Sequence, residues 1–297
     1  MRGAGALLAA ALALGCLASA ATAAAPAGGA AVMLAPARMQ VGEVRRYRVD
    51  SESTISHGGR QHRETNSQIF DFRVVGAADG RLVIEDTLVS SELSAGETSY
   101  AGLMLQAAEG LPVAYVADAS GKPLDFVDLP GVRTSLIARL RALEAQSPEL
   151  ILALIASVEG MDKEEAMMTF LSEPRAVADM QAWPPMSGAR LDDEPWTVGA
   201  GDTLARLTSW REIEARNVSD CRIGVRRVTA LDPKSPVAQT RRQFERLETA
   251  GLLSLEDGWI LQMTQTREHG VRGVRERLVQ TFTRLPAADA AGGRCGA

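Results

Sequence analysis

The sequence holds few residues whose types and spacing could bind a metal. His57 and His62 lie five positions apart around a Gly-Gly turn, and no third ligand of suitable spacing lies nearby. Zinc sites normally use three or four such ligands. Glu268-His269 lacks the second histidine of a metalloprotease motif. The sequence therefore predicts no metal site.

Residues for nucleophilic or acid–base catalysis are equally sparse. Serines are numerous, but none stands in the G-x-S-x-G pattern of a hydrolase nucleophile. Glu85 and Asp86 are neighbours in a strand-like segment, so their side chains point to opposite faces and do not form a carboxylate pair. We therefore expect a non-enzymatic protein with no cofactor.

Basic residues gather late in the chain and could form a binding stripe. Arg226, Arg227, Arg241 and Arg242 would lie across neighbouring strands, an arrangement suited to anionic headgroups or phosphates. The alternative is a solvated outer sheet face on which acids separate the arginines. The formal net charge of −5 gives no general footprint for nucleic acid, so no nucleic-acid partner is expected.

Residues 1–25 read as a secretory signal peptide. A single basic residue, Arg2, precedes the apolar run 6–17, and small residues typical of a cleavage site follow. A periplasmic or secreted location is expected. The run Leu12-Ala13-Leu14-Gly15-Cys16 is similar to a bacterial lipobox, which would make Cys16 a lipid anchor; the alternative is a cysteine that simply belongs to the apolar run. No later apolar run is long enough to cross a bilayer, so the mature chain is predicted to have no transmembrane segment.

Two cysteines remain beyond the leader. In an oxidising compartment Cys221 and Cys295 invite one disulfide. The other interpretation is one buried thiol and one incidental thiol in the Gly/Ala-rich tail.

Two strand-rich regions flank the centre of the chain. Residues 40–128 alternate with a period of two and are divided by turn residues such as Gly58-Gly59 and Asp79-Gly80. Residues 194–285 repeat this layout, with Asp257-Gly258 as one of the turns. Both regions are predicted to be antiparallel meanders, although Tyr100–Glu109 is compatible with either strand or helix.

The region between the meanders, 131–183, has helical periodicity and is predicted to form about four short helices. Ser147 followed by Pro148 is a helix start, and Asp162 with Glu165 fits a capping box. Residues Leu150 to Val158 are apolar nearly all round, which predicts a helix without a solvent face.

This helical block has two interpretations. Its helices could pack on the sheet as core, or helices and a curved sheet could enclose an apolar cavity whose wall is shaped by flexible methionines. The residues that would line such a cavity are Leu150, Leu154, Val158, Met167, Met168 and Phe170.

Together these elements predict a flexible lead-in (26–39), a single α+β domain (40–285) and a flexible tail (286–297). The domain would be a curved antiparallel β-sheet, an open half-barrel, with the short helices packed on it.

The layout of residues 40–285, rather than any motif, resembles the periplasmic lipoprotein-carrier superfamily. That superfamily includes the lipoprotein-localisation factors A and B, in which helices cover the concave face of an open half-barrel. The resemblance implies a protein that binds a lipid or another apolar ligand between sheet and helices. The alternative from the residues is an envelope structural or assembly protein that acts on partner proteins through sheet edges and the arginine-rich strands.

Overall fold

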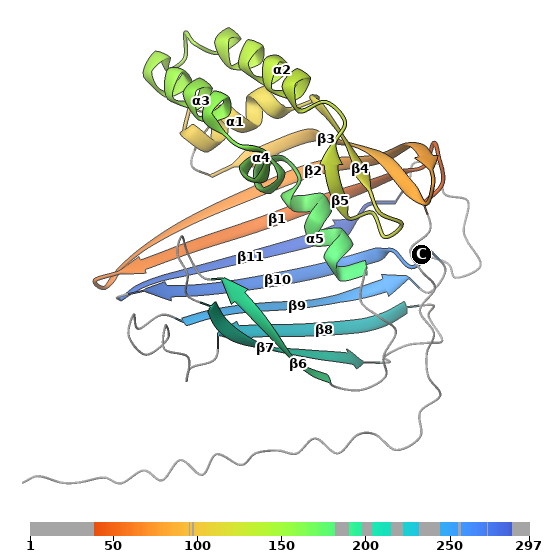
Figure 1. Ribbon diagram of the computed structural model, residues 1–297. Helices are drawn as coiled ribbons and strands as arrows, with labels where there is room; N and C mark the ends of the chain where they lie inside the picture. Colours follow the sequence, from red (N-terminus) through yellow and green to blue (C-terminus); the bar gives the residue numbers. More distant parts are fainter. Residues whose placement is uncertain are drawn as a thin grey trace, which may run out of the picture.

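The computed structural model describes residues 39–94, 96, 98–181, 190–197, 204–214, 222–231, 244–254, 257–271 and 273–286. Its strands form one open antiparallel sheet of 11 strands in the order β5-β4-β3-β2-β1-β11-β10-β9-β8-β7-β6 (Figure 1). The first meander supplies β1 (Val44–His57), β2 (Arg60–Ala78), β3 (Arg81–Leu93), β4 (Pro112–Ala117) and β5 (Pro123–Phe126). The second supplies β6 (Arg190–Thr197), β7 (Leu204–Glu214), β8 (Arg222–Leu231), β9 (Phe244–Ser254), β10 (Ile260–Val271) and β11 (Val274–Arg284).

The first and last strands pair at the centre of this sheet. β1 and β11 run antiparallel with Cα partners from Tyr47 and Arg284 to Ser56 and Arg275. Each meander therefore starts or ends at this seam and extends outward to one edge. The prediction of a curved antiparallel sheet with helices packed on it is confirmed.

Two predicted hairpin turns form where the sequence places them. Gly58 and Gly59 have φ angles of 56° and 77° and join β1 to β2. Asp79 and Gly80, at 52° and 72°, join β2 to β3. Positive φ at both central residues gives a turn whose twist matches that of the flanking strands, and glycine adopts it without steric cost.

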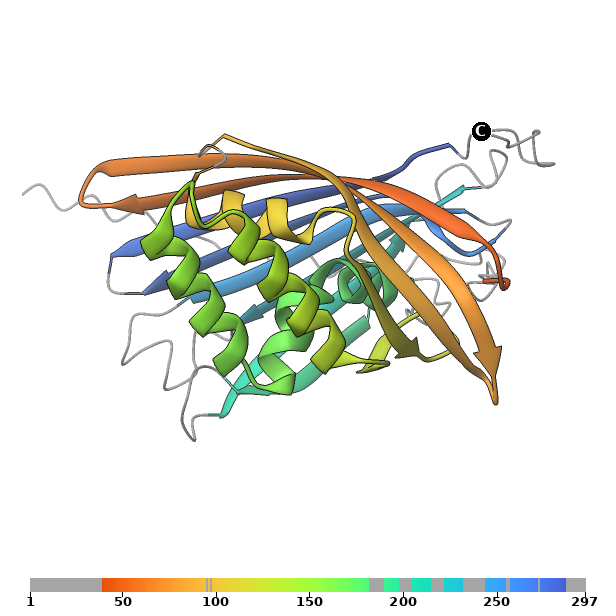
Figure 2. The same ribbon diagram turned by 90° about the horizontal axis from the view of Figure 1, so that it is seen from above.

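Five helices accompany the sheet. α1 (Tyr100–Ala108) lies between β3 and β4, which decides the strand-or-helix ambiguity of that segment; Ser99 caps it by accepting a hydrogen bond from the Gly102 N–H. α2 (Leu129–Ala142), α3 (Pro148–Gly160), α4 (Lys163–Phe170) and α5 (Ser172–Gln181) follow β5 and confirm the predicted block of four. Seen from above, the helices lie on one side of the sheet (Figure 2).

The helix starts were predicted with mixed success. The capping box before α4 is confirmed, because Asp162 accepts from the Glu165 N–H and the Glu165 carboxylate accepts from the Asp162 N–H. Ser147 does occupy the N-cap of α3, but its side chain makes no capping hydrogen bond. β6 begins at Arg190, ahead of the predicted boundary at 194.

The prediction that the helix through Leu150–Val158 has no solvent face is wrong. Leu152 is 60% exposed, whereas Leu154 and Val158 are fully buried. The buried stripe of α3 packs against α1 and α2, not against the sheet; their shared core includes Leu103, Leu136 and Leu140. Neighbouring helices supply cover on one side only, and small residues with a single leucine occupy the other.

A second core lies between the sheet and the last two helices. The face of the sheet that they cover, called the covered face below, includes Tyr47, Phe72 and Tyr115. Ala166 of α4 and Val177 of α5 pack onto it. The five helices thus fall into two groups. Helices α1–α3 pack mainly on one another, and helices α4 and α5 cover the sheet.

Replacing Leu154 by alanine tests this division. We expect Leu154→Ala to lower the free energy of unfolding by about 2–5 kcal/mol, because it opens a cavity in the α1–α3 core. Leu152→Ala on the same helix should change it by no more than about 0.5 kcal/mol. Urea denaturation followed by circular dichroism measures both, and equal losses would contradict the one-sided packing of α3.

Candidate functional site

An open groove of about 1130 Å³ lies beside α4, between the edge strand β5 and the other helices. One wall is Leu124 of β5. The apolar lining continues with Met161, which follows α3, and with Met167 and Met168 of α4; Arg175 of α5 also contributes.

The methionines differ in exposure because α4 lies with one side on the core. Met161 is 9% exposed and forms the floor, and it belongs to the same core as the fully buried Ala166. Met168 is 59% exposed and Leu124 is 45% exposed. The groove therefore presents uncovered apolar side chains from two different elements, and the thioether side chains can adapt to the shape of what they contact.

Charged groups at the rim of the groove are largely occupied. The Lys163 Nζ lies 2.8 Å from the Asp125 Oδ2. The hydrogen bond from Lys163 lowers the pKa of Asp125 from its ordinary value. The Arg175 Nη1 donates to the Met168 Sδ at 3.3 Å, and its Nε lies 4.0 Å from Asp179. Since the lining also contains Asp162, Glu164 and Glu165, acids outnumber bases there.

The structure brings together only two of the six predicted cavity residues. Met167 and Met168 line the groove. Leu154 and Val158 are buried in the core of α1–α3, and Leu150 packs against it. Phe170 packs between the two cores, with its ring edge-on to Phe126 at 6.4 Å between centroids.

Two of the groove's apolar residues, Leu124 and Met161, were missed. Met161 stands directly before the capping box that starts α4, so a search for methionines around that helix would have found it. Leu124 carries no local signal, because only the pairing of β5 at the sheet edge brings it beside α4.

The space between the sheet and α5 is filled. Between Phe72, Ile84 and Tyr115 on the sheet and Val177 and Ala178 on α5, a void of only about 10 Å³ remains. That volume is close to the minimum for a single water. For this part of the chain, core packing describes the observed state and a ligand-sized chamber does not.

The arginine stripe is only partly described. On β8, Arg226 donates from Nε and Nη2 to the Glu248 Oε1 at 2.9 and 2.8 Å, and Arg246 of β9 donates to Oε2 at 2.7 Å. The hydrogen bond from Arg226 is the main cause of the lowered pKa of Glu248. This pairing favours the interpretation of arginines separated by acids. Arg227 is the next residue of β8, whereas Arg241, Arg242, Cys16, Cys221 and Cys295 lie outside the described residues.

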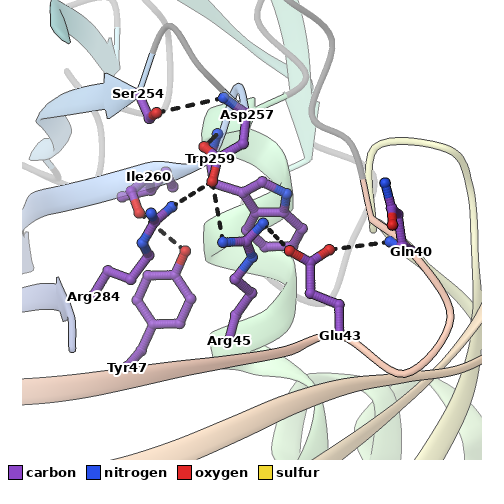
Figure 3. A network of polar contacts seen from close by, with 9 residues as sticks. All are labelled: Gln40, Glu43, Arg45, Tyr47, Ser254, Asp257, Trp259, Ile260 and Arg284. Atoms are coloured by element: carbon purple, nitrogen blue, oxygen red, sulfur yellow. Dashed lines mark hydrogen bonds and ion pairs between the residues drawn. The ribbon is translucent and has the colours of Figure 1, made fainter. Parts of the chain in front are cut away.

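A polar network joins the β1–β11 seam to the turn before β10 (Figure 3). The Asp257 Oδ2 lies 3.1 Å from the Arg45 Nη1 and 2.9 Å from the Arg284 Nη1. The Asp257 Oδ1 accepts from the Trp259 N–H at 3.0 Å, and the Arg45 guanidinium lies 5.4 Å from the Trp259 ring centre. Arg45 also pairs with Glu43.

This network holds its charges in pairs, so we interpret it as a structural clamp. Burial raises the pKa of Asp257, but the Trp259 N–H and the charges of Arg284 and Arg45 outweigh it, and the net shift is downward. Burial raises the pKa of Tyr47, which keeps its hydroxyl protonated to donate to the Ile260 carbonyl at 3.0 Å. Sequence patterns gave no sign of this cluster, because Tyr47 and Ile260 are 213 residues apart.

Neither a metal-ligand cluster nor a membrane-spanning helix occurs among the described residues. In those ranges no group of three or more His, Cys, Asp or Glu side chains is placed to hold a metal ion. No helix of the described chain combines the length and the apolar character needed to cross a membrane.

Comparisons with known proteins give no family. No family model matches the sequence, and no curated protein matches it. Among solved structures, the fold is similar to that of a lipovitellin structure described under the words "lipid-protein interactions in lipovitellin". The TM-score is 0.47, and the sequence identity is 10% over 87% of this chain and 27% of that one. A second is Ail, the attachment invasion locus protein of Yersinia pestis, with a TM-score of 0.14 and 6% identity over 82% of this chain and 98% of that one. The chain spans about a quarter of that lipovitellin chain, and neither likeness is strong enough to support an assignment.

Removing the central charge of the clamp should destabilise the seam. We expect Asp257→Asn to lower the free energy of unfolding at pH 7 by about 1.5–3 kcal/mol, as for hydrogen bonds to charged groups. Because folding lowers the pKa of Asp257, its carboxylate stabilises the fold above the unfolded pKa of about 3.9 and loses this effect as the pH falls through the folded pKa. The difference in free energy of unfolding between wild type and Asp257→Asn should therefore become smaller at acidic pH.

Urea titrations between pH 2.5 and pH 7 measure this difference. Asp50→Asn is the matched control, because Asp50 is exposed and pairs with Arg48 two residues away, a contact worth no more than about 1 kcal/mol. A pH-independent difference between wild type and Asp257→Asn would show that the charge of Asp257 is not what holds the turn.

Proposed function

We propose that this protein is a non-enzymatic binding protein for a lipid or another apolar ligand, held in the groove beside α4. The observation that carries the proposal is the exposure of both Met168 and Leu124 in the lining of one groove of ligand size. Most other large apolar side chains of the described chain are packed into the two cores. Apolar side chains left uncovered in one concave place commonly mark a binding surface.

The binding free energy expected from this groove suits a weakly bound acyl chain that lies partly in solvent. Each methylene removed from water contributes about 0.8 kcal/mol, so covering some six methylenes gives about 5 kcal/mol. That corresponds to a dissociation constant of the order of 0.1–1 mM for one acyl chain, before any headgroup contact. A ligand with two chains, or one with a favourable headgroup, would bind more tightly.

The charges of the rim indicate which headgroups are compatible. Lys163 is paired with Asp125, and Arg175 is engaged by Met168 and Asp179. Glu164 lies in the lining and is exposed. A neutral or cationic headgroup therefore fits this groove better than an anionic one.

The alternative, an envelope assembly protein acting through sheet edges, has less physical support. The edge strand β5 spans only Pro123–Phe126, and the edge strand β6 contains Pro195. Short edge strands and edge prolines oppose pairing with another sheet. Assembly through other surfaces would appear in crosslinking of whole cells as a stable protein partner.

Paired polar substitutions test the site. We expect Met168→Gln to raise the dissociation constant of the uncharged probe N-phenyl-1-naphthylamine about fivefold to tenfold, because an apolar contact worth about 1 kcal/mol is lost. Leu152→Gln removes an equally exposed apolar side chain of α3 outside the groove and should leave the constant unchanged. Fluorescence titration measures both variants.

Two outcomes would contradict the proposal. Equal effects of the two substitutions would mean that the probe does not use the groove. The binding function itself would be contradicted if protein purified from its own host carried no lipid and bound no apolar probe. Native mass spectrometry and solvent extraction detect bound lipid.

We also propose that the protein acts outside the cytoplasm, on the basis of the leader-like residues 1–25. Mass spectrometry of the protein from its host should find a mature N-terminus among the small residues at 19–26. A diacylated Cys16 at the N-terminus would support the lipid-anchored alternative instead. A chain that retains Met1 would contradict cleavage of this leader.

A further inference from the structure

Asp86 is a carboxyl group buried beneath α5 without a cation to balance it. Its side chain is on the covered face of β3 and only 4% exposed. In the sheet it lies between Phe72 of β2 and Val113 of β4. One carboxyl oxygen of Asp86, Oδ1, has no hydrogen-bond partner. The Asp86 carboxyl group accepts a hydrogen bond from the Thr87 N–H.

The charged groups that act on Asp86 are acidic. Glu173, in the first turn of α5, is near enough for its charge to be felt, and Asp71 of β2 adds to it from the other face of the sheet. The Glu173 carboxylate accepts from the Ser172 Oγ at 2.6 Å. From β4, the hydroxyl of Tyr115 is also within electrostatic reach of Asp86.

Basic residues in this part of the molecule are engaged elsewhere. Arg45 stands in the same register row as Asp86, two strands away beyond Phe72, but it is held by Glu43 and Asp257. On α5 itself, Arg175 faces Met168 and Asp179. A negative charge on Asp86 would therefore lie in an apolar core without compensation, which is among the costliest arrangements in a protein.

We propose that α5 is a pH-sensitive cover of the sheet, seated when Asp86 is protonated and loosened when Asp86 ionises beside Glu173. This inference concerns the cover of the sheet and does not assume that the groove beside α4 binds a ligand. Burial, followed by the charge of Glu173, raises the pKa of Asp86 well above its ordinary value. Burial raises the pKa of Glu173 as well.

The raised pKa values of Asp86 and Glu173 determine how the stability of the α5 contact changes with pH. A group whose pKa rises on folding supports the folded state fully below its unfolded pKa, about 3.9 for aspartate. That support is lost as the pH rises through the folded pKa. The seating of α5 should therefore be firmest in mild acid and weaken toward alkaline pH, which is opposite to the effect of Asp257.

The contacts of α5 suit a local opening. Its apolar contact with the sheet rests on a short row of residues, among them Val177 and Ala178. Its printed polar ties to other elements are exposed: the ion pair of Lys122 with Asp179 at 3.3 Å and the hydrogen bond from Arg175 to Met168 of α4. Lifting α5 would uncover Ile84 and Tyr115, whereas the strand pairings and the α1–α3 core do not depend on it.

Hydrogen exchange of the full-length protein between pH 5 and pH 9, corrected for the intrinsic rate at each pH, tests the proposal. In wild type the protection of the α5 amides should fall by about tenfold or more across this range, while that of α2 stays constant. Asp86→Asn keeps the size of the side chain without its charge, so the fall in α5 protection should be much smaller and limited to the part that the titration of Glu173 causes. Asp50→Asn, on an exposed position of the same sheet, should behave as wild type.

Glu173→Gln supplies a second variant in case Asp86→Asn folds poorly. It removes the neighbouring charge but leaves Asp86 titratable, so the fall in protection should be smaller and its midpoint should move to lower pH. Constant protection of α5 in wild type would overturn the proposal, as would a fall of the wild-type size in Asp86→Asn. Neither result would bear on probe binding by the groove.

Discussion

The pairing of β1 with β11 is the constraint on which the structure depends. It joins the start of the first meander to the end of the second, and without it the sheet would be two separate sheets. Closing so long a loop costs little more than closing a short one. A tenfold greater length adds only about 2 kcal/mol of entropy. The clamp of Asp257, Arg45 and Arg284 lies at the end of this seam, where it can offset a cost of that size.

The seam also determines where the helices lie. Because the meanders extend outward from the centre, the chain leaves the first at one edge strand, β5, and enters the second at the other, β6. The connection between the edges contains α2–α5 and passes over one side of the sheet (Figures 1 and 2). The groove forms beside β5, where α4 comes close enough for Lys163 to pair with Asp125 while Leu124 stays exposed.

Local rules predicted much of this architecture from the sequence. Paired glycines, Asp-Gly and the capping box give their turns and helix starts directly, since each depends on neighbouring residues alone. The start of β6 was missed because Asp192, Asp193 and Glu194 have low strand propensity. Pairing with β7 overrides that preference.

The features that the sequence did not predict all depend on distant partners. An apolar composition could not reveal that α3 is covered on one side only. Because Glu85 and Asp86 are adjacent in a strand, the sequence predicts that their side chains point to opposite faces. Nothing in the sequence near Asp86 indicated that Glu173 would lie close to it. The groove was half predicted, because its methionines are local to α4 while Leu124 arrives through the sheet.

Two carboxyl groups, the half-buried Asp257 and the buried Asp86, show how one sheet can carry opposite electrostatic arrangements. Asp257 meets two guanidinium groups and a backbone N–H, so its ionised form is the stable one and it fastens the seam. Asp86 meets apolar side chains and another acid, so its surroundings disfavour the ionised form and raise the pKa of its carboxyl group. A leucine at that position would remove the cost of about 1–3 kcal/mol that an unpaired polar atom imposes on a core. Since the seam is tied by charge pairs and α5 rests over an unpaired acid, we expect α5 to open more readily than the seam.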